Sequence, residues 1–292
     1  MIISHMLGGI GNQMFQYAAG KSLSLKTNQV HWLDLNDFNG YQLHNGFELD
    51  RVFNIEDIKS SPTVAKELLS WRANSFAKKI LRRSHFAKLR GQSFIVEPYF
   101  NYWPNFFELK QDCYLYGYWQ SERYFKDFAD IIRQDFAFKI PLDERNKQIA
   151  LDIANTQSVS LHVRRGDYIN DTKNTSVMAV CSVNYYQDAI KYIKDRFEQP
   201  VLYIFSDDIT WVKEHLSTEL PYVYIDHNNG LESYRDMQLM SLCKHHIIAN
   251  SSFSWWGAWL NPSADKVVIA PKKWFVNKNN IDDLIPQDWI KL

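Results

Sequence analysis

The stretch SLHVRRGDYIN, Ser160–Asn170, is an apolar segment that ends in two adjacent arginines and a glycine. By the two-residue period of a β-strand, the apolar positions share one face, namely Val159, Leu161 and Val163. The other face carries His162 and then Arg164 toward the end of the strand. Arginine is seldom buried without a partner. Arg164 therefore either pairs with an internal carboxylate or is delivered by the strand to a crevice that binds an anion.

Strands and helices alternate in the sequence that follows this stretch. A helix with an apolar stripe is expected near 183–197, and a short helix follows the strand at 201–205. Further strands are expected at 222–226, 245–250 and 266–270, with helical patterns between them. The first 35 residues show the same order of strand, glycine turn, helix and strand. This alternation is typical of parallel crossovers and predicts an α/β fold with doubly wound parallel sheets.

The composition bounds the class of protein. The chain has 292 residues, which suits one large domain or two of ordinary size, and its 33 Lys and Arg balance 33 Asp and Glu. No general attraction to nucleic acid is therefore implied. Cys113, Cys181 and Cys243 lie far apart without a C-x-x-C pair, which favours free thiols in a reducing compartment. We find no signal-peptide core and no apolar run of about 18 residues, so we expect a cytoplasmic protein.

One region departs from this balance of charge. Segment 72–90 is rich in Lys and Arg, and no acidic residue occurs between Glu67 and Glu97. Two interpretations remain open: a solvated helix face, or a basic amphipathic helix that rests on an anionic membrane. The second would place the protein peripherally at the inner face of the cell membrane.

Ligands of parallel sheets of this kind bind outside the carboxyl ends of the strands. Polar residues follow four strands of the second half at this point, in chain order Arg164, Arg165, Gly166 and Asp167; Ser206, Asp207 and Asp208; His227, Asn228 and Asn229; Asn250, Ser251 and Ser252. The arginines and the serine pair suit a polyanion, because a helix that begins at the serines presents N–H groups and a favourable dipole to phosphate. The serines and Asp208 also fit ordinary helix caps.

The N-terminal segment GGIGNQ offers a rival interpretation. Gly9, Gly11 and the later Asp34 fit the first parts of the G-x-G-x-x-G dinucleotide pattern with its distal acid. Met14 occupies the third glycine position, where it would obstruct close packing of helix and strand. A nicotinamide-dependent oxidoreductase is therefore an alternative, but it explains neither the doubled arginine nor the serine pair.

The sequence contains no D-x-D pair and no H-E-x-x-H motif. The acid pair that bridges a cation in metal-dependent sugar-nucleotide transferases is thus missing, and His245 and His246 are expected in the core. A diphosphate bound here would be neutralised by arginine and backbone donors. We therefore expect no metal site.

Five segments occur in order between residues 8 and 260, namely GGIGNQMFQYA, GYWQSERYF, HVRRGDY, FSDDITW and ANSSFSWWGAWL. They closely resemble the successive motifs of glycosyltransferase family 11, the α-1,2-fucosyltransferases, and HVRRGD is shared more widely with α-1,6- and protein O-fucosyltransferases. Region 60–110 matches none of these motifs. The resemblance implies a GT-B fold of two facing Rossmann-like domains, which we place at 1–154 on the acceptor side and at 155–292 for most of the donor.

The resemblance also implies an activity. It is the transfer of L-fucose from GDP-fucose to O2 of a galactose in a glycan, with inversion and without a metal or other cofactor. The partners would then be the nucleotide sugar and a galactose-containing glycan, such as a surface polysaccharide or lipopolysaccharide unit. A non-catalytic sugar-binding protein is a second alternative, because it would account for the 15% aromatic content and the cluster Tyr116, Tyr118, Trp119 and Tyr124. The oligomeric state is left open.

The resemblance assigns roles to particular residues. Arg164 would meet the negative charge that grows on the β-phosphate of the leaving GDP. Asn12 would lie near the sugar and the leaving group, and Asp167 is the candidate general base, with capping of the Gly166 turn as its equal alternative. The expected donor-binding set is Gly9, Asn12, His162, Arg164, Arg165, Asp207, Asp208, Asn250, Ser251 and Ser252. Within this set His162 and Asp207 resemble guanine contacts, and the serines would hold phosphate oxygens. Arg165 points to the other face of the strand, so we expect it to have a supporting role, with an internal carboxylate as its partner.

Overall fold

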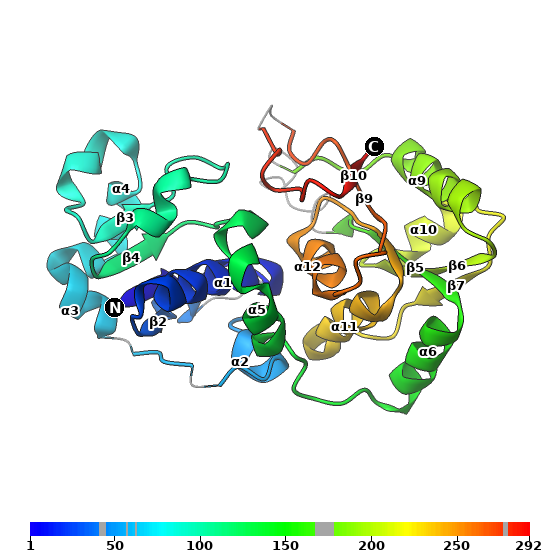
Figure 1. Cartoon of the computed structure of the whole chain (residues 1–292), viewed down its shortest axis with the longest axis horizontal. Helices are drawn as coiled ribbons and strands as arrows, with labels where there is room; N and C mark the ends of the chain where they lie inside the picture. Colours follow the sequence, from blue (N-terminus) through cyan, green and yellow to red (C-terminus); the bar gives the residue numbers. More distant parts are fainter. Residues whose placement is uncertain (41–44, 57, 62, 167–177, 277–279) are drawn as a thin grey trace. The chain divides into compact units, whose positions relative to one another are not determined.

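The computed structural model describes residues 1–40, 45–56, 58–61, 63–166, 178–276 and 280–292 (Figure 1). The chain divides into two compact units, one formed by Met1–Lys139 with Asn280–Pro286 and the other by Ile140–Asn279 with Gln287–Leu292. Each unit has its own parallel sheet, so the predicted α/β fold with parallel sheets is confirmed.

The first unit is built on a four-stranded sheet in the order β2-β1-β4-β3. Its strands are β1 (Ile2–His5), β2 (His31–Asp34), β3 (Phe94–Val96) and β4 (Cys113–Tyr116), and all of the pairings are parallel. Helix α1 (Ile10–Thr27) joins β1 to β2 and is buried over its first turns. A Cβ at Gly20 would lie 2.0 Å from Ser4 Oγ, so α1 can approach β1 this closely only with glycine there.

Shorter helices complete the first unit: α2 (Leu49–Val52), α3 (Val64–Leu69), η2 (Ser70–Ala73), α4 (Ser75–Leu81), η3 (Ser84–Leu89), η4 (Pro104–Glu108) and α5 (Ala129–Asp135). Helix α3 packs on β2 and β4, and its buried side chains join Ile3, Phe94 and Tyr114 in one core cluster. The basic region between β2 and β3 is therefore part of a folded core and not a free-standing helix.

The second unit has a six-stranded sheet in the order β10-β9-β8-β5-β6-β7. Its strands are β5 (Gln157–Val163), β6 (Pro200–Ser206), β7 (Tyr222–Ile225), β8 (His245–Ile247), β9 (Val268–Ala270) and β10 (Ile290–Lys291). Its helices are α6 (Glu144–Asn155), α9 (Val183–Arg196), α10 (Ile209–His215), α11 (Tyr234–Leu242) and α12 (Ser252–Leu260). All of the pairings are parallel, as the alternation of strands and helices predicts.

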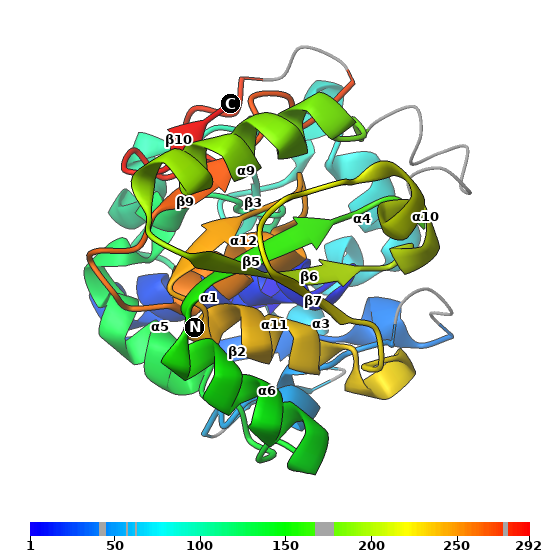
Figure 2. The same cartoon turned by 90° about the vertical axis from the view of Figure 1, so that its right-hand side faces the viewer.

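Helices cover both faces of this second sheet (Figure 2). Val159, Leu161 and Val163 of β5 pack against α9 and α10 on one face, which confirms the predicted alternation of that strand. On the other face, Tyr203 and Phe205 of β6 pack against α6 and α11. Helix α6, which we placed in the first domain by expecting 1–154, thus belongs to the core of the second unit, and the chain passes between the units at residues 139 and 140.

The three cysteines are buried and free, as the sequence predicts. The two core histidines are also where we expected them. His246 is fully buried, and its two ring nitrogens contact Ser160 Oγ at 2.8 Å and Asn261 Nδ2 at 3.0 Å.

Candidate functional site

Arg164 and Asp207 lie side by side at the carboxyl edge of the second sheet. Strands β5 and β6 are in register at Val163 and Ser206, so the next residue of each strand meets the other. Arg164 Nε lies 3.2 Å from Asp207 Oδ2, and both side chains are about a quarter exposed at 26% and 23%. Of the two alternatives for Arg164, the internal carboxylate is therefore present, and the guanidinium still reaches the solvent at the edge where ligands of such sheets bind.

The Asp207 carboxylate also holds the turn that follows β5. Its two oxygens accept the backbone N–H of Arg165 at 2.9 Å and of Gly166 at 3.0 Å. A Cβ at Gly166 would lie 3.0 Å from Asp207 Oδ2 and 3.3 Å from Cγ, so the turn packs against the carboxylate only because residue 166 is glycine. The contact of Asp207 with guanine stays a prediction. Within the chain, Asp207 positions Arg164 and the turn after β5.

Arg165 and Asp208 both contact helix α10. The Arg165 guanidinium lies over the Trp211 ring, with its carbon 3.7 Å from the ring centroid, so an aromatic face supports Arg165. Asp208 accepts the Trp211 N–H at 3.1 Å and is the N-cap of α10. This is the structural role that capping residues ordinarily have.

The start of helix α12 lies beside the end of β5. Ser251 is the N-cap: its backbone is extended, its side chain is buried, and its Oγ accepts the Phe253 N–H at 3.3 Å. Ser252 is the first helical residue and is half-buried. The Phe253 ring lies 5.9 Å from the ring of His162, which is itself buried on β5. The N-terminus of α12, with its backbone N–H groups and positive dipole end, therefore belongs to the same edge as Arg164.

Asn250 lies at this edge in the sequence but points into the interior. It is fully buried, and its Nδ2 donates to the carbonyls of Ala179 at 2.5 Å and Trp274 at 2.9 Å. Its Oδ1 accepts from the Cys181 thiol at 3.3 Å. These contacts tie two loops to the end of β8 and give Asn250 a structural role. Asp167 lies outside the described residues.

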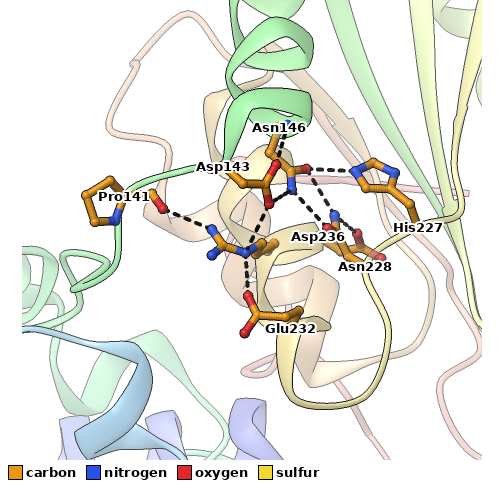
Figure 3. A network of polar contacts seen from close by, with 8 residues as sticks. Pro141, Asp143, Asn146, His227, Asn228, Glu232 and Asp236 are labelled. Carbon is orange, nitrogen blue, oxygen red and sulfur yellow. Dashed lines mark hydrogen bonds and ion pairs between the residues drawn. The ribbon is translucent and has the colours of Figure 1, made fainter.

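A polar network closes the end of the edge strand β7 (Figure 3). His227 Nε2 contacts Asn146 Oδ1 at 3.1 Å, and Asn228 Nδ2 donates to Asn146 Oδ1 at 3.2 Å and to Asp236 Oδ1 at 2.9 Å. Burial raises the pKa of Asp236 to about 7, although the bond from Asn228 opposes that rise. Burial also lowers the pKa of His227. The network joins the first turns of α6 and α11, and it explains why polar residues follow β7.

Arg235 extends the same network to Pro141, Glu232 and Asp143, which are labelled in Figure 3. Its guanidinium is buried, and Nη1 donates to the Pro141 carbonyl at 3.1 Å. Nε donates to Glu232 at 2.5 Å and lies 3.6 Å from Asp143, the N-cap of α6. These polar residues after β7 therefore join helices of the second unit.

In the first unit, the turn between β1 and α1 is held by side-chain amides. Gln13 Nε2 donates to the carbonyls of Gly8 and Gly46, both at 2.8 Å, and Gln13 Oε1 accepts the Glu48 N–H at 3.0 Å. Gln16 exchanges two hydrogen bonds with the backbone of Leu7, at 2.9 and 3.3 Å. Gly9 is the N-cap of α1 and has extended backbone. The motif thus builds a rigid turn of buried glutamines around its glycines.

Asn12 lies on this turn with a fixed orientation. Gln120 Nε2 donates to Asn12 Oδ1 at 2.7 Å, which directs the Asn12 amide so that Nδ2 is its donor end. Gly8 has a φ of +81°, and a Cβ there would lie 2.9 Å from Asn12 Nδ2, so glycine is required beneath this amide. We did not predict Gln120. The only signal for it is its place in GYWQSERYF, directly after β4 at the carboxyl edge of the first sheet.

Glu97 is a second residue that we did not predict. It follows β3 at the same edge of the sheet, and its two oxygens accept the N–H groups of Tyr118 at 2.7 Å and Trp119 at 3.0 Å. Burial raises the pKa of Glu97 to about 7, against the effect of these two bonds. Trp119 has a φ of +57°, a conformation that non-glycine residues rarely adopt. Glu97 therefore holds the turn that leads to Gln120.

The aromatic cluster expected for sugar stacking divides into two kinds of residue. Trp119 and Tyr124 are fully buried and pack against Phe106, so they belong to the core. Tyr116 stacks on His5, with 4.5 Å between ring centroids. Tyr118 is 42% exposed, so only this member of the four presents much surface to a ligand.

Asp34, the distal acid of the dinucleotide pattern, is buried and fully engaged. Lys78 Nζ lies 2.5 Å from Asp34 Oδ2, Tyr114 donates to the same oxygen at 2.6 Å, and Asn36 Nδ2 donates to Oδ1 at 2.7 Å. Burial alone would raise the pKa of Asp34, but Lys78 and the hydrogen bonds hold that pKa below its usual value. A ribose hydroxyl has no access to this carboxylate, so the oxidoreductase alternative loses its main support.

Within the described residues, no group of three or more His, Cys, Asp or Glu side chains is arranged to hold a metal ion. The described donor-site residues of the second unit include the partly exposed guanidinium of Arg164 and the N-terminus of α12. Such groups can neutralise an anion directly. Whether the reaction proceeds without a metal stays a prediction.

Comparison with known proteins agrees with this chemistry. Residues 5–292 match the family model for Glycosyl transferase family 11. The α-1,2-colitosyltransferase of Escherichia coli is 36% identical over 304 residues, which cover 100% of this chain and 99% of the relative. The O-antigen biosynthesis glycosyltransferase WbnK of Escherichia coli is 34% identical over 320 residues, which cover 99% of both chains.

Among solved structures, the fold resembles fucosyltransferase NodZ from Bradyrhizobium. The TM-score is 0.56 at 13% identity, and the match covers 89% of this chain and 93% of NodZ. A structure of the NodZ α-1,6-fucosyltransferase soaked with GDP-fucose gives a TM-score of 0.53 at the same identity, over 89% of this chain and 92% of that one. At this level of identity the likeness shows the fold, which is of the GT-B type.

Proposed function

Because this chain belongs to glycosyl transferase family 11, we propose that it transfers L-fucose from GDP-fucose to O2 of a terminal β-linked galactose. The product would be an α-1,2 linkage, formed with inversion. The observation that carries the proposal is Arg164, which Asp207 fixes at the end of β5 beside the N-terminus of α12.

The leaving group explains why this arrangement suits the reaction. As the bond between the sugar C1 and the phosphate oxygen breaks, negative charge grows on the β-phosphate of GDP. Arg164 would donate to that charge with a planar fork that matches phosphate. The N–H groups of α12 would hold other phosphate oxygens, with Ser252 at its first position. Donors that are already in place stabilise the transition state without reorganisation.

The same groups support transfer without a metal. The guanidinium and the helix dipole supply the positive charge that a divalent cation otherwise brings to a diphosphate. Asp207 holds the Nε edge of Arg164 by an ion pair and the next turn by two backbone hydrogen bonds, so the direction of the guanidinium is set before a ligand binds.

We assign Asn12 to the sugar side of the reaction. Its amide is oriented by Gln120, which leaves Nδ2 as a donor for the sugar or the leaving-group oxygen. Inversion also requires a base for the acceptor hydroxyl, and Asp167 remains the proposed candidate. A transition state with oxocarbenium character needs only a weak base, because the electrophile is strongly activated.

A second donor deserves a test because a relative that is 36% identical along the whole chain is named a colitosyltransferase. Colitose is fucose without its 3-hydroxyl, so the two nucleotide sugars share GDP and differ by a single oxygen. A site that hydrogen-bonds this hydroxyl would reject GDP-colitose by roughly 10⁴-fold, whereas a site shaped for colitose would reject GDP-fucose by about 10²-fold.

The deciding experiment offers both donors to the protein with a panel of galactose-terminated oligosaccharides. The linkage and the anomeric configuration of each product are read by NMR. Faster transfer from GDP-fucose to O2 of galactose supports the proposal. Faster transfer from GDP-colitose would show that colitose, and not fucose, is the sugar that the protein transfers. Binding of NAD without GDP in calorimetry, or binding of glycans with no transfer from either donor, would instead favour one of the two non-transferase alternatives.

We further propose that the acceptor is a unit of a surface polysaccharide or lipopolysaccharide. The name of WbnK, an O-antigen biosynthesis enzyme, supports this assignment for a chain that it matches at 34% identity from end to end. An array that includes O-antigen repeat units beside simple galactosides would test it, because a preference for the repeat unit is the expected result.

A further inference from the structure

Helices η2, α4 and η3, in the connection between β2 and β3, carry none of the residues that we assign to the transfer reaction. No acidic residue occurs in this segment, residues 70–89. We define the interfacial patch as the exposed aromatic, leucine, lysine and arginine side chains of this segment, which are Trp71, Phe76, Lys79, Arg82, Arg83, Phe86, Lys88 and Leu89.

The other two Lys and Arg residues of the segment, Arg72 and Lys78, make contacts within the fold. Lys78 is buried and pairs with Asp34. Arg72 Nε donates to the Leu89 carbonyl at 2.7 Å, which ties η2 to the end of η3. These residues are structural and cannot serve a partner.

Arg90 closes the segment in the same way. Its Nε donates to the Leu81 carbonyl at 2.7 Å, and Nη2 lies 3.2 Å from the carbonyls of both Arg82 and Arg83. The bonds from Arg72 and Arg90 together bring the end of η3 to η2 and to the end of α4. Residues that are distant in sequence, such as Trp71 and Arg83, therefore belong to one small folded surface.

The charged part of the interfacial patch is unbalanced. Lys79, Arg82, Arg83 and Lys88 are exposed, and within the described part of the chain no acid pairs with any of them. Some other surface bases are paired with acids: Lys194, for example, pairs with Glu219 at 2.6 Å. The chain as a whole is neutral, so this excess of positive charge is local.

The apolar side chains of the interfacial patch are unusually exposed to solvent. Trp71 is 56% exposed, Phe76 72% and Leu89 50%. Trp71 also borders a hollow of about 460 Å³, which is lined in addition by Asn36, Ala65, Lys66, Ser70, Ala73 and Asn74. Exposed aromatic residues beside unpaired bases are typical of surfaces that enter the headgroup region of a bilayer.

We propose that the interfacial patch binds the surface of a bilayer rich in anionic lipid. Trp71, Phe76 and Leu89 would enter the boundary between headgroups and acyl chains, while the four bases contact lipid phosphates. Within the described residues no helix could cross a membrane, so the attachment would be peripheral. Four bases near an anionic surface strengthen binding by roughly a thousandfold at low salt, and salt screens this gain.

Sedimentation with vesicles tests the proposal on the full chain. Vesicles of phosphatidylcholine are compared with vesicles in which phosphatidylglycerol replaces part of it, at low and high salt. The protein should sediment with the anionic vesicles at low salt only. The double substitution Arg82→Gln/Arg83→Gln should weaken this binding by roughly thirtyfold, since each base contributes about fivefold.

Matched variants separate the patch from general charge. Lys191→Gln/Arg196→Gln removes two exposed bases from α9 and should leave vesicle binding unchanged. Trp71→Ala should weaken binding to the anionic vesicles at low salt, because it removes the apolar contact. Each variant should keep wild-type transfer to a soluble galactoside, which shows that its fold is intact.

Several results would overturn the proposal. They are no sedimentation with anionic vesicles at low salt, equal binding to phosphatidylcholine alone, and equal losses from the α9 variant and the patch variant. Binding of a single-stranded oligonucleotide as tight as that of vesicles would also overturn it, because the patch would then attract polyanions in general.

Discussion

Asp207 of β6 holds Arg164 of β5 by an ion pair of 3.2 Å and holds the two residues after Arg164 by their backbone N–H groups. One carboxylate thus fixes both the guanidinium and the turn that presents it. Each side chain is partly exposed, so the pair by itself contributes little to stability. The ion pair serves to orient the Arg164 side chain. Mutation of either residue should therefore change the rate of transfer without unfolding the protein.

Arg164→Ala should lower kcat by about 10²–10³, as the loss of one preorganised anion donor usually does. Arg164→Lys should recover only part of that loss, because an ammonium lacks the planar fork. Initial rates with GDP-fucose and a soluble galactoside measure both variants. Rates within tenfold of wild type for Arg164→Ala, with an unchanged circular dichroism spectrum, would contradict the role of Arg164.

Asp207→Asn should lower kcat by roughly 10- to 100-fold, the usual cost of removing a group that orients another. The amide keeps the size of the carboxylate but loses the charge that pairs with Arg164. Gly166→Ala should act in the same direction, because its Cβ would press on Asp207. Asp188→Asn, an exposed change on α9, is the control and should not alter the rate. A wild-type rate for Asp207→Asn would show that the ion pair is dispensable.

Gln120→Glu should reduce kcat almost as far as Asn12→Ala does. A carboxylate at 120 cannot donate to Asn12 Oδ1, so the Asn12 amide would turn and present oxygen where Nδ2 now lies. The double variant should be no slower than Asn12→Ala alone, because residues that act together are not additive. The cycle is measured as kcat at saturating donor, and strictly additive losses would refute the coupling.

Transfer should persist after excess EDTA and should not rise when Mg²⁺ is restored. The physical reason is that Arg164 and the α12 N-terminus would supply the positive charge that the diphosphate needs. The rate of GDP release before and after chelation is the measurement. Activity that EDTA abolishes and Mg²⁺ restores would end the metal-free scheme.

Asp236→Asn should flatten the dependence of stability on pH. Because burial raises the pKa of Asp236 from 3.8 to about 7, the folded protein keeps this proton to a higher pH than the unfolded chain does. Asp236 therefore makes a contribution to the free energy of unfolding that falls as pH rises from about 4 to 7 and is constant above that range. Glu97 adds a slope of the same sign, which the variant retains.

Urea unfolding between pH 5 and 8 measures this difference. The amide at 236 can still accept from Asn228, so Asp236→Asn should unfold at a higher urea concentration than wild type at pH 8, with less difference at pH 5. Asp226→Asn is the matched control, because Asp226 directly follows β7 and its side chain is 37% exposed. If the free energy of unfolding depends on pH in the same way for wild type and for Asp236→Asn, the pKa of Asp236 is not raised in the folded protein.

Local pattern was enough to predict much of the second unit. The alternation along β5 places Val159, Leu161 and Val163 against α9 because a strand has only two faces. The same rule puts the ends of parallel strands at one edge, so Arg164, Asp207 and the α12 N-terminus could be expected near one another. Caps such as Asp208 and Ser251 were also visible in advance, since capping depends on residues three positions apart at most.

Partners that are distant in the chain could not be predicted in this way. Lys78 looked like a member of a basic surface, but it is buried because Asp34, 44 positions earlier, needs a counter-charge. Asn250 looked like a ligand group, but its amide joins Ala179 and Trp274. Gln120 was missed for the same reason, because its partner Asn12 is 108 positions away. Sequence periodicity carries no information about such pairs.

The last thirteen residues of the chain serve both units. Asp283 accepts from Arg123 and from the Tyr102 backbone in the first unit, whereas Leu292 pairs with Ala270 and β10 completes the second sheet. The first unit can therefore be produced whole only with nearly the entire chain, whereas residues 140–292 contain the whole second unit together with residues 280–286 of the first. During synthesis on the ribosome, the first unit must wait for almost the entire polypeptide before its final contacts can form, and a cut near residue 279 would damage both halves at once.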